Sequence, residues 1–328
     1  MKAVIIEKFG PPGLASIQEI PQPSPGPGEL LIQVKAAPVN FVDSLVFEGQ
    51  YQFLPERPFT PGKGPVGIVL EVGEGVMDFS SGDRVLAMAE HGGYAEAALV
   101  QAQNAYQIPE NLSFEEAAAV SLAYDTAWFS LFERGRCQPG EVVLVLGATG
   151  AVGGAAVQLA KAKGAKVLAA VSSAHRGEEL LALGADGIID LSRPDLKNSL
   201  REQVFVQTNG AGADIVIDPL GGDPFEAAIR AVAWRGRFVV VGFAAGRIPN
   251  LKINYILLKN IEVSGMQISD YRKRCPMIVR EAMIEIFELA ENGEIKLPTS
   301  QSLPLSDYAT GLQLIMGRKA KGRVVLIP

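Results

Sequence analysis

The sequence predicts an α/β protein in which a doubly wound parallel sheet is joined to a smaller, mainly β domain. After residue 135, short apolar runs such as VVLVL and FVVV alternate with helical stretches, as in parallel strands buried on both faces. Before residue 125, the segments are short, alternate polar with apolar residues and are broken by Gly and Pro. At 328 residues, the chain can hold about two domains.

The first domain is expected to be an open β-barrel. In ELLIQVKAA, Ile32, Val34 and Ala36 alternate with Gln33 and Lys35, the pattern of a strand with one buried face. Its strands are expected at 2–9, 29–39, 67–73, 84–89 and 94–100. The run PQPSPGPGE at 21–29 stands close to strand patterns on both sides, so it is predicted to be a rigid loop and not a domain linker.

The second domain follows a strand-helix rhythm of six strands, which indicates a doubly wound nucleotide-binding fold. The strands are expected at 142–146, 166–171, 187–189, 214–218, 237–241 and 261–265, and the main helices at 151–163, 175–183 and 224–234. The tail predicts a helix at 276–292, a second helix from Ser306 as N-cap to about Met316, and a strand at 323–327. We expect the tail to pack onto the first domain.

Composition favours a small-molecule partner. The net charge of −6 comes from interspersed acids and bases without a basic run, so we expect neither nucleic acid nor a membrane surface as partner. The apolar stretch at 4–6 is too short for a signal peptide, and the charge-free segment 142–160 is interrupted by glycines. The two cysteines, Cys137 and Cys275, fit a reducing cytoplasm without disulfides.

A glycine-rich turn follows the first strand of the second domain. In LGATGAVGG, Ala148, Gly150 and Gly153 have the spacing of the dinucleotide fingerprint, with alanine at its first position. Gly150 would let the backbone approach a pyrophosphate, and the N–H groups of Ala151 and Val152 would hold its charge. The alternative is a tight turn that binds nothing; the strand before it and the helix after it favour a dinucleotide.

The end of the second strand favours NADPH over NADH. An acidic residue that would bind the ribose hydroxyls of NADH is absent from VSSAHR, where Ser172 and Ser173 offer hydroxyls and Arg176 can pair with a 2′-phosphate. The alternative role for the two serines is helix capping.

No metal site is expected. The chain holds only two histidines, His91 and His175, and the two distant cysteines, which do not make the three or four ligands of a usual zinc site.

The chain resembles the medium-chain dehydrogenase/reductase superfamily. The matching segments are NFVDSLVFEGQY (40–51), PGKGPVGIVLEVGEGVMDFSSGDRV (61–85), the run from AYDTAW to KAKGAKV (123–167), and DPLGGDPFEAAIRAVAWRGRFVVVGFAAGRIP (218–249). Within the superfamily it is similar to the zinc-free NADPH:quinone oxidoreductase, or zeta-crystallin-like, branch. The resemblance implies a GroES-like β-barrel domain at 1–122 and 263–328 and a Rossmann domain at 123–262.

Several positions depart from relatives. Zinc alcohol dehydrogenases carry a Gly-His-Glu ligand segment where this chain has Gly62-Lys63-Gly64, and most quinone-reductase-like members keep a glutamate at Gly64. Many relatives have a tyrosine at Leu191, near the adenosine phosphate. The resemblance implies that Arg318 and Lys319 approach that phosphate.

The resemblance also names catalytic candidates. Tyr51, in Gly-Gln-Tyr, matches the proposed proton donor of similar enoyl reductases, because a phenol can protonate the enolate formed when hydride reaches a conjugated carbonyl. Asn40 and Asp43 match positions that line the nicotinamide pocket; their alternative role is to cap or turn the chain after a strand.

Further contacts are implied for cofactor and substrate. Thr126 corresponds to a threonine that touches the nicotinamide carboxamide, and Tyr124 stands near the place of a zinc ligand, where it reaches the substrate or belongs to the core. Residues after the later strands lie where ligands bind in open α/β sheets. These cofactor candidates are Leu220, Phe243, Ala244 and Met266.

We therefore expect an NADPH-dependent, zinc-free reductase of quinones or other α,β-unsaturated carbonyls. One alternative is an enoyl-thioester reductase of the acrylyl-CoA type, for which Lys63 is the one basic residue available to a CoA phosphate. The other is a cofactor-binding scaffold or sensor with little turnover. A homodimer is implied through the sixth strand, where residues 261–264 alternate suitably.

Overall fold

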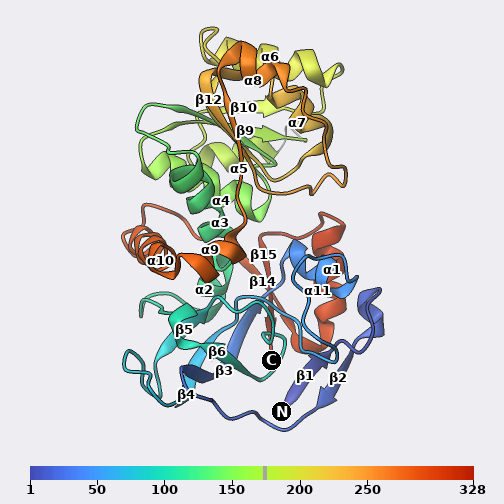
Figure 1. The fold of residues 1–328 in the computed structure, drawn as a ribbon, viewed down its shortest axis with the longest axis vertical. Coiled ribbons are helices and arrows are strands. Elements are labelled where there is room, and N and C mark those ends of the chain that lie inside the picture. Colours follow the sequence, from blue (N-terminus) through green and yellow to red (C-terminus); the bar gives the residue numbers. More distant parts are fainter. Residues whose placement is uncertain (173–175) are drawn as a thin grey trace. The chain divides into compact units, whose positions relative to one another are not determined.

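The computed structural model describes residues 1–172 and 176–328, which form two compact units (Figure 1). Unit 1 comprises Met1–Leu122, Arg272–Glu291 and Leu297–Pro328, and unit 2 comprises Ala123–Tyr271 and Asn292–Lys296. Strand β13 (Glu262–Gly265) thus belongs to unit 2, although the predicted domain change lies at residue 263. The reason is its hydrogen-bonded pairing with β12 (Val232–Val240).

Unit 2 is built on a six-stranded parallel sheet. Its order, β10-β9-β8-β11-β12-β13, is the doubly wound order and confirms the predicted fold class. The chain runs outward from β8 on one side and returns to its other side with β11, so the direction switches between these two strands. The remaining strands of the sheet are β8 (Val142–Leu146), β9 (Lys166–Val171), β10 (Gly187–Asp190) and β11 (Ala213–Asp218).

One helix precedes β8, and the other helices connect the strands of the sheet. They are α3 (Ala123–Trp128), α4 (Ala151–Ala162), α5 (Gly177–Ala182), α6 (Leu196–Gln207), α7 (Gly222–Ala228) and α8 (Asn254–Lys259), with a π-helical turn at Phe129–Arg134. The predicted helix at 224–234 is wrong in its last turn, because Val232 already pairs with Ala213 as the first residue of β12. The core between helices and sheet includes Leu144, Val216 and Phe238, all fully buried.

Unit 1 contains a seven-stranded open sheet and a separate β1-β2 hairpin. Its centre is β3, which pairs with β4, β6 and β15; Ile32, Val34 and Ala36 of β3 are buried, whereas Gln33 is exposed, as predicted. The strands are β1 (Lys2–Ile5), β2 (Ser16–Glu19), β3 (Glu29–Pro38), β4 (Val66–Val72), β5 (Arg84–Ala87), β6 (Ala97–Gln101), β7 (Ala105–Gln107), β14 (Ser300–Pro304) and β15 (Arg323–Ile327).

The helices of unit 1 flank this sheet. They are α1 (Phe41–Phe47), α2 (Phe114–Val120), α10 (Pro276–Glu291) and α11 (Tyr308–Met316); α9 (Ile268–Arg274) has residues in both units. Ser306 is not an N-cap, because a 3₁₀ turn at Leu305–Asp307 buries Leu305 before α11 begins. Among the helices of the described residues, none has the length and apolarity to cross a membrane.

Candidate functional site

The carboxyl ends of the parallel strands in unit 2 carry most of the predicted cofactor residues. The strands run in the same direction and in order, so the residues that follow them lie along one edge of the sheet. Leu220 packs directly over the turn after β8: a Cβ on Gly147 would lie 2.9 Å from Leu220 Cδ2. The structure brings to this edge Ala148, Gly150, Ser172, Leu220, Phe243, Ala244 and Met266.

The glycines of the turn after β8 have different reasons to be glycine. A Cβ on Gly153 would lie 2.3 Å from the carbonyl oxygen of Gly147, so close packing of α4 against the turn requires Gly153. Gly150 has an ordinary φ of −80°, and a Cβ there would meet only the Gly147 oxygen at 3.3 Å. A side chain at Gly150 would therefore conflict with the fold much less than one at Gly153, and Gly150 is exposed, which leaves room for an approaching ligand.

This turn fits a dinucleotide pyrophosphate. Gly150 is the N-cap of α4 and offers no side chain to the helix start, which leaves the first N–H groups, including those of Ala151 and Val152, to be satisfied from outside the helix. The helix dipole adds positive potential at the same point. Ala151 is exposed and Val152 is half-buried.

The residues predicted to read the adenosine end lie directly after β9. Ser172 is exposed, and Arg176 is half-exposed with its Nε 3.8 Å from a carboxylate oxygen of Glu179. Ser173 and His175 lie outside the described residues. Leu191, where many relatives have a tyrosine, follows β10, and its backbone N–H donates to the Val171 oxygen at 2.8 Å.

Asp218 is a residue of this edge that the sequence analysis did not single out. It is fully buried at the end of β11, and its Oδ1 accepts hydrogen bonds from the backbone N–H groups of Leu220 (2.8 Å) and Gly221 (2.9 Å). Its Oδ2 has no hydrogen-bond partner among the described residues. Burial raises the pKa of Asp218 to about 6, against the lowering effect of the two backbone hydrogen bonds. Asp218 thus fixes the loop that carries Leu220.

Thr126 and Tyr124 are buried in α3. The backbone N–H of Thr126 donates to Asp125 Oδ1 at 2.6 Å. The hydroxyl of Tyr124 accepts from Gln158 Nε2 at 3.1 Å, and Gln158 in turn accepts from the backbone N–H of Lys296 at 2.6 Å. Tyr124 thus joins α3 to α4 through Gln158, and Gln158 joins α4 to the segment Asn292–Lys296 of the same unit.

In unit 1, the segment Gly62-Lys63-Gly64 forms a backbone arch that only glycines permit. Gly62 has φ +97° and Gly64 has φ +68°. A Cβ on Gly62 would lie 2.3 Å from the Tyr94 ring, and one on Gly64 would lie 1.8 Å from the hydroxyl oxygen of Ser121. The departure from the family glutamate at Gly64 therefore has a physical reason, because the buried Ser121 occupies that space.

The arch turns Lys63 into the protein. Its side chain is 2% exposed, its ammonium pairs with the Glu90 carboxylate, and Nζ also donates to the Glu90 carbonyl oxygen at 3.1 Å. The same Nζ lies 4.7 Å from the ring centroid of Tyr51. Glu90 also accepts from Arg272, whose Nη1 is 3.3 Å from Oε1. The structure thus brings together two predicted residues, Tyr51 and Lys63. The residues that hold Lys63 in place, Glu90 and Arg272, were not among the predicted residues.

Asn40 and Asp43 meet at the start of α1. Asp43 is fully buried, and its Oδ2 accepts from the backbone N–H of Asn40 (2.8 Å) and from the hydroxyl of Tyr94 (3.1 Å). The side-chain oxygen of Asn40 accepts from Arg323 Nη2 at 2.8 Å. Burial raises the pKa of Asp43 to about 6, while the Asn40 backbone bond, the Lys63 charge and Tyr94 act in the opposite direction. The capping role anticipated as the alternative is thus present for both residues.

The remaining predicted cofactor residue, Arg318, lies in unit 1 just after α11. It has φ +55°, and its backbone N–H donates to the Ile315 oxygen at 3.1 Å.

Cys137 is not a candidate nucleophile. Burial raises the pKa of its thiol to about 11, which makes it a poor nucleophile.

The described residues offer no ligand set for zinc. No group of three or more His, Cys, Asp or Glu side chains in residues 1–172 and 176–328 is arranged to hold a metal ion. The segment that resembles a ligand segment of the zinc enzymes presents the Lys63 ammonium, which donates hydrogen bonds and repels a cation.

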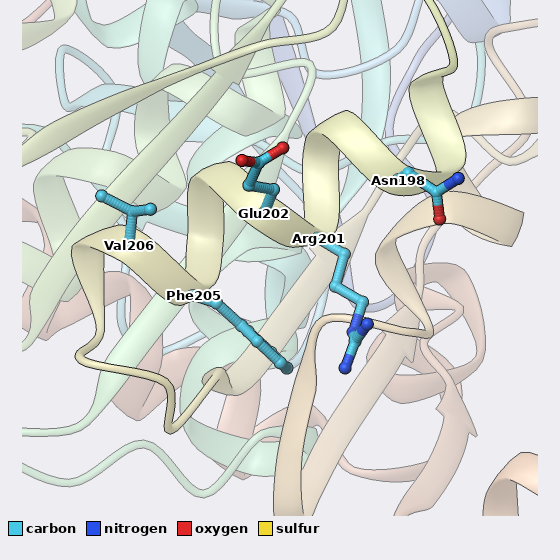
Figure 2. A pocket seen from close by; sticks show the side chains of 5 residues that line it. All are labelled: Asn198, Arg201, Glu202, Phe205 and Val206. Carbon is cyan, nitrogen blue, oxygen red and sulfur yellow. The ribbon is translucent and has the colours of Figure 1, made fainter.

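One surface hollow is lined by none of the predicted site residues. It has a volume of about 490 Å³ and lies on α6, where Arg201 and Phe205 point to one side and Glu202 to the other (Figure 2). Its remaining lining residues are Asn198 and Val206. The guanidinium carbon of Arg201 lies 4.6 Å from the Phe205 ring centroid. Its lining includes neither the residues that follow the parallel strands nor the Gly62-Lys63-Gly64 arch.

Comparison with known proteins agrees with this geometry. A family model described as "Zinc-binding dehydrogenase" matches residues 151–285, and one described as "Alcohol dehydrogenase GroES-like domain" matches residues 26–110. The chain is 36% identical over 331 residues to the quinone oxidoreductase-like protein 2 homolog of Nematostella vectensis, covering 99% of this chain and 88% of that protein.

Solved structures give the same result for the fold. The quinone oxidoreductase of Escherichia coli, in complex with NADPH, matches with a TM-score of 0.92 at 29% identity over 100% of both chains. That of Pseudomonas syringae pv. Tomato DC3000 matches with a TM-score of 0.92 at 29% identity, over 100% of this chain and 99% of that one. With a GroES-like unit, a doubly wound sheet and these relatives along its whole length, the chain belongs to the quinone oxidoreductase branch of the medium-chain dehydrogenase/reductase superfamily.

Proposed function

We propose that the protein is an NADPH-dependent reductase that transfers hydride to quinones or other α,β-unsaturated carbonyl compounds without zinc and acts in the cytoplasm. The observation that carries this proposal is the turn after β8, where Gly150 is exposed at the start of α4 and a Cβ there would conflict with the fold much less than one on Gly153. The solved complex of the E. coli relative with NADPH supports the choice of ligand.

The residues at the sheet edge of unit 2 would hold the dinucleotide. The N–H groups of Ala151 and Val152 would bind the pyrophosphate, and Gly153 keeps the helix close to it. Ser172, Ser173 and Arg176 would bind the 2′-phosphate. The carboxamide would be held by Thr126 and by backbone groups of Phe243 and Ala244, beside Leu220 and Met266.

When bound, NADPH supplies a hydride from C4 of its nicotinamide. Tyr51 would donate the proton from Oη to the enolate that results when a conjugated carbonyl receives that hydride at its β-carbon. A quinone demands less of Tyr51, because the hydroquinone anion is delocalised and takes its proton from water. Asn40 and Asp43 fix the start of α1, eight or more residues before Tyr51, and would support the pocket wall from there.

The observations do not favour the CoA-thioester alternative. It depended on Lys63 as a phosphate ligand, but the Lys63 ammonium is buried and engaged by Glu90. A scaffold or sensor would use the same dinucleotide edge without turnover, so only kinetics separate it from a reductase.

We also propose that the protein forms a homodimer through β13. This strand is the last of the parallel sheet, so its outer edge is available for pairing. On α8 and just before it, Ile253, Leu257 and Leu258 are 76%, 77% and 71% exposed, which is unusual for a cluster of large apolar side chains. A monomeric mass in light scattering at micromolar concentration would contradict the dimer.

The test of function is NADPH oxidation by chelator-treated protein with a simple quinone, an enone, a conjugated acyl-CoA ester and a plain ketone. We expect oxidation with the quinone and the enone but not with the ketone. Preference for the acyl-CoA ester would shift the assignment to thioester reduction. NADPH binding without turnover of any acceptor would contradict the reductase and support the scaffold.

A further inference from the structure

The Lys63 ammonium lies where an unpaired charge would be costly. Removing an ammonium from water is unfavourable unless a counter-ion and hydrogen bonds replace its hydration. Glu90 supplies both, through its carboxylate and its carbonyl oxygen, and its carboxylate is itself held by the buried Arg272. These contacts fix the position of the lysine ammonium.

The surrounding backbone is shaped to hold this lysine. Both neighbours of Lys63 are glycines with positive φ, and at each of them a Cβ would collide with a buried side chain, Tyr94 or Ser121. The arch directs one side chain inward, and that side chain reaches Tyr51.

The contact with Tyr51 gives the lysine a chemical role. Nζ lies 4.7 Å from the ring centroid, within the range of a cation–π interaction. With the neutral phenol, this attraction is to the ring quadrupole alone. When the phenol gives up its proton, the negative charge spreads into the ring, and the attraction becomes that of two opposite charges. The interaction therefore strengthens as the reaction proceeds, which is the condition for accelerating it.

We propose that Lys63 is a positioning residue for proton donation by Tyr51, an inference that rests on the reductase function proposed above. In this step, hydride forms the new C–H bond at the β-carbon of the enone, the Tyr51 O–H bond breaks, and its proton completes the saturated ketone. The phenolate that remains is stabilised by the Lys63 ammonium until water returns a proton. Glu90 and Arg272 hold the ammonium in place.

The experiment compares kcat/KM for an enone and a quinone in wild type, Lys63→Met, Tyr51→Phe and the double variant. Lys63→Met should lower enone reduction about 10- to 100-fold and quinone reduction less than about threefold. Because the lysine acts through Tyr51, adding Lys63→Met to Tyr51→Phe should cause no further loss. Lys63→Arg, which keeps the charge, should recover part of the enone activity.

Controls separate this role from a structural one. Lys273→Met removes an exposed lysine that lies 4.1 Å from the ring centroid of Phe53, the aromatic neighbour of Tyr51, and should leave both activities unchanged. If Lys63→Met does not fold, Lys63→Gln replaces it, since its amide can still donate to Glu90. Equal losses with both acceptors, or losses that multiply in the double variant, would overturn the role of Lys63. Failure of the wild type to reduce either acceptor would instead overturn the proposed function.

Discussion

The hydroxyl oxygen of Ser121 lies 1.8 Å from the point where a Cβ on Gly64 would stand. The two residues share one buried space, which the serine fills. The pair fixes the backbone of the Gly62-Lys63-Gly64 arch and thereby the direction of Lys63.

Gly64→Ala should destabilise the protein by at least about 2 kcal/mol, because the added methyl group meets Ser121 and the positive φ disfavours alanine. Ser121→Gly in the same chain should restore part of that loss by removing the steric conflict, although the unfavourable φ remains. The free energy of unfolding in urea measures both. Equal stabilities of Gly64→Ala and wild type would contradict the shared-space account.

Gly150→Ala and Gly153→Ala should fail in different ways. Gly150→Ala should lower the unfolding temperature without ligand less than Gly153→Ala does, but it should bind NADPH about 10- to 100-fold more weakly, as expected if the added methyl group keeps the pyrophosphate from one charge-assisted hydrogen bond. Gly153→Ala should lower the unfolding temperature itself, because its Cβ meets the Gly147 oxygen at 2.3 Å. Thermal unfolding and fluorescence titration separate the two. Unchanged NADPH affinity in Gly150→Ala would argue for a turn that binds nothing.

Arg176→Ala should weaken NADPH about tenfold or more and NADH much less, since only NADPH has the 2′-phosphate that the guanidinium would pair with. Titration of both nucleotides measures the ratio. Glu179→Gln is the matched control: it removes the carboxylate 3.8 Å from Arg176 and should leave NADPH affinity equal or higher. Equal losses for NADPH and NADH in Arg176→Ala would remove Arg176 from the phosphate site.

The stability contributed by Asp218 should fall as pH rises. Its pKa is about 6 in the folded protein against an ordinary 3.8, so the folded state takes up its proton more readily than the unfolded state. The contribution is fully present below pH 3.8 and is lost as pH rises through 6, in total about 3 kcal/mol. Asp218→Asn keeps an acceptor for the N–H groups of Leu220 and Gly221 and does not titrate.

Unfolding free energies at pH 5 to 8 test this. The stability of wild type relative to Asp218→Asn should decline from pH 5 to about pH 6.5 and stay constant above about pH 7, where Asp218 is ionised in both the folded and the unfolded state. Asp190→Asn is the control, because hydrogen bonds from Ser192 hold the pKa of Asp190 below its ordinary value, and its contribution should stay constant there. Parallel curves for wild type and Asp218→Asn would show that Asp218 does not titrate as described.

Local pattern and spacing determined much of this protein. Apolar runs predicted the parallel strands, alternation in β3 predicted its buried face, and the glycine spacing after Leu146 predicted the turn at the start of α4. These features depend on residues close together in the chain, so their signal is present in any short window. The same locality explains an error: Val232 to Trp234 continued a helical pattern, but pairing with Ala213 made them a strand.

Tertiary structure alone decided how the remaining residues act. Lys63, Glu90 and Arg272 are far apart in sequence. Only the fold of unit 1 brings the Lys63 ammonium and the Arg272 guanidinium to the Glu90 carboxylate. The sequence identified Lys63 as a basic residue that could bind a CoA phosphate. In the structure its side chain is buried, and its ammonium is held beside the Tyr51 ring. The surroundings of Gly64 and Gly150 also differ: Gly64 packs against the buried Ser121, whereas Gly150 is exposed at the start of α4. Burial and distance set the energy of a charge, and neither can be read from the order of residues.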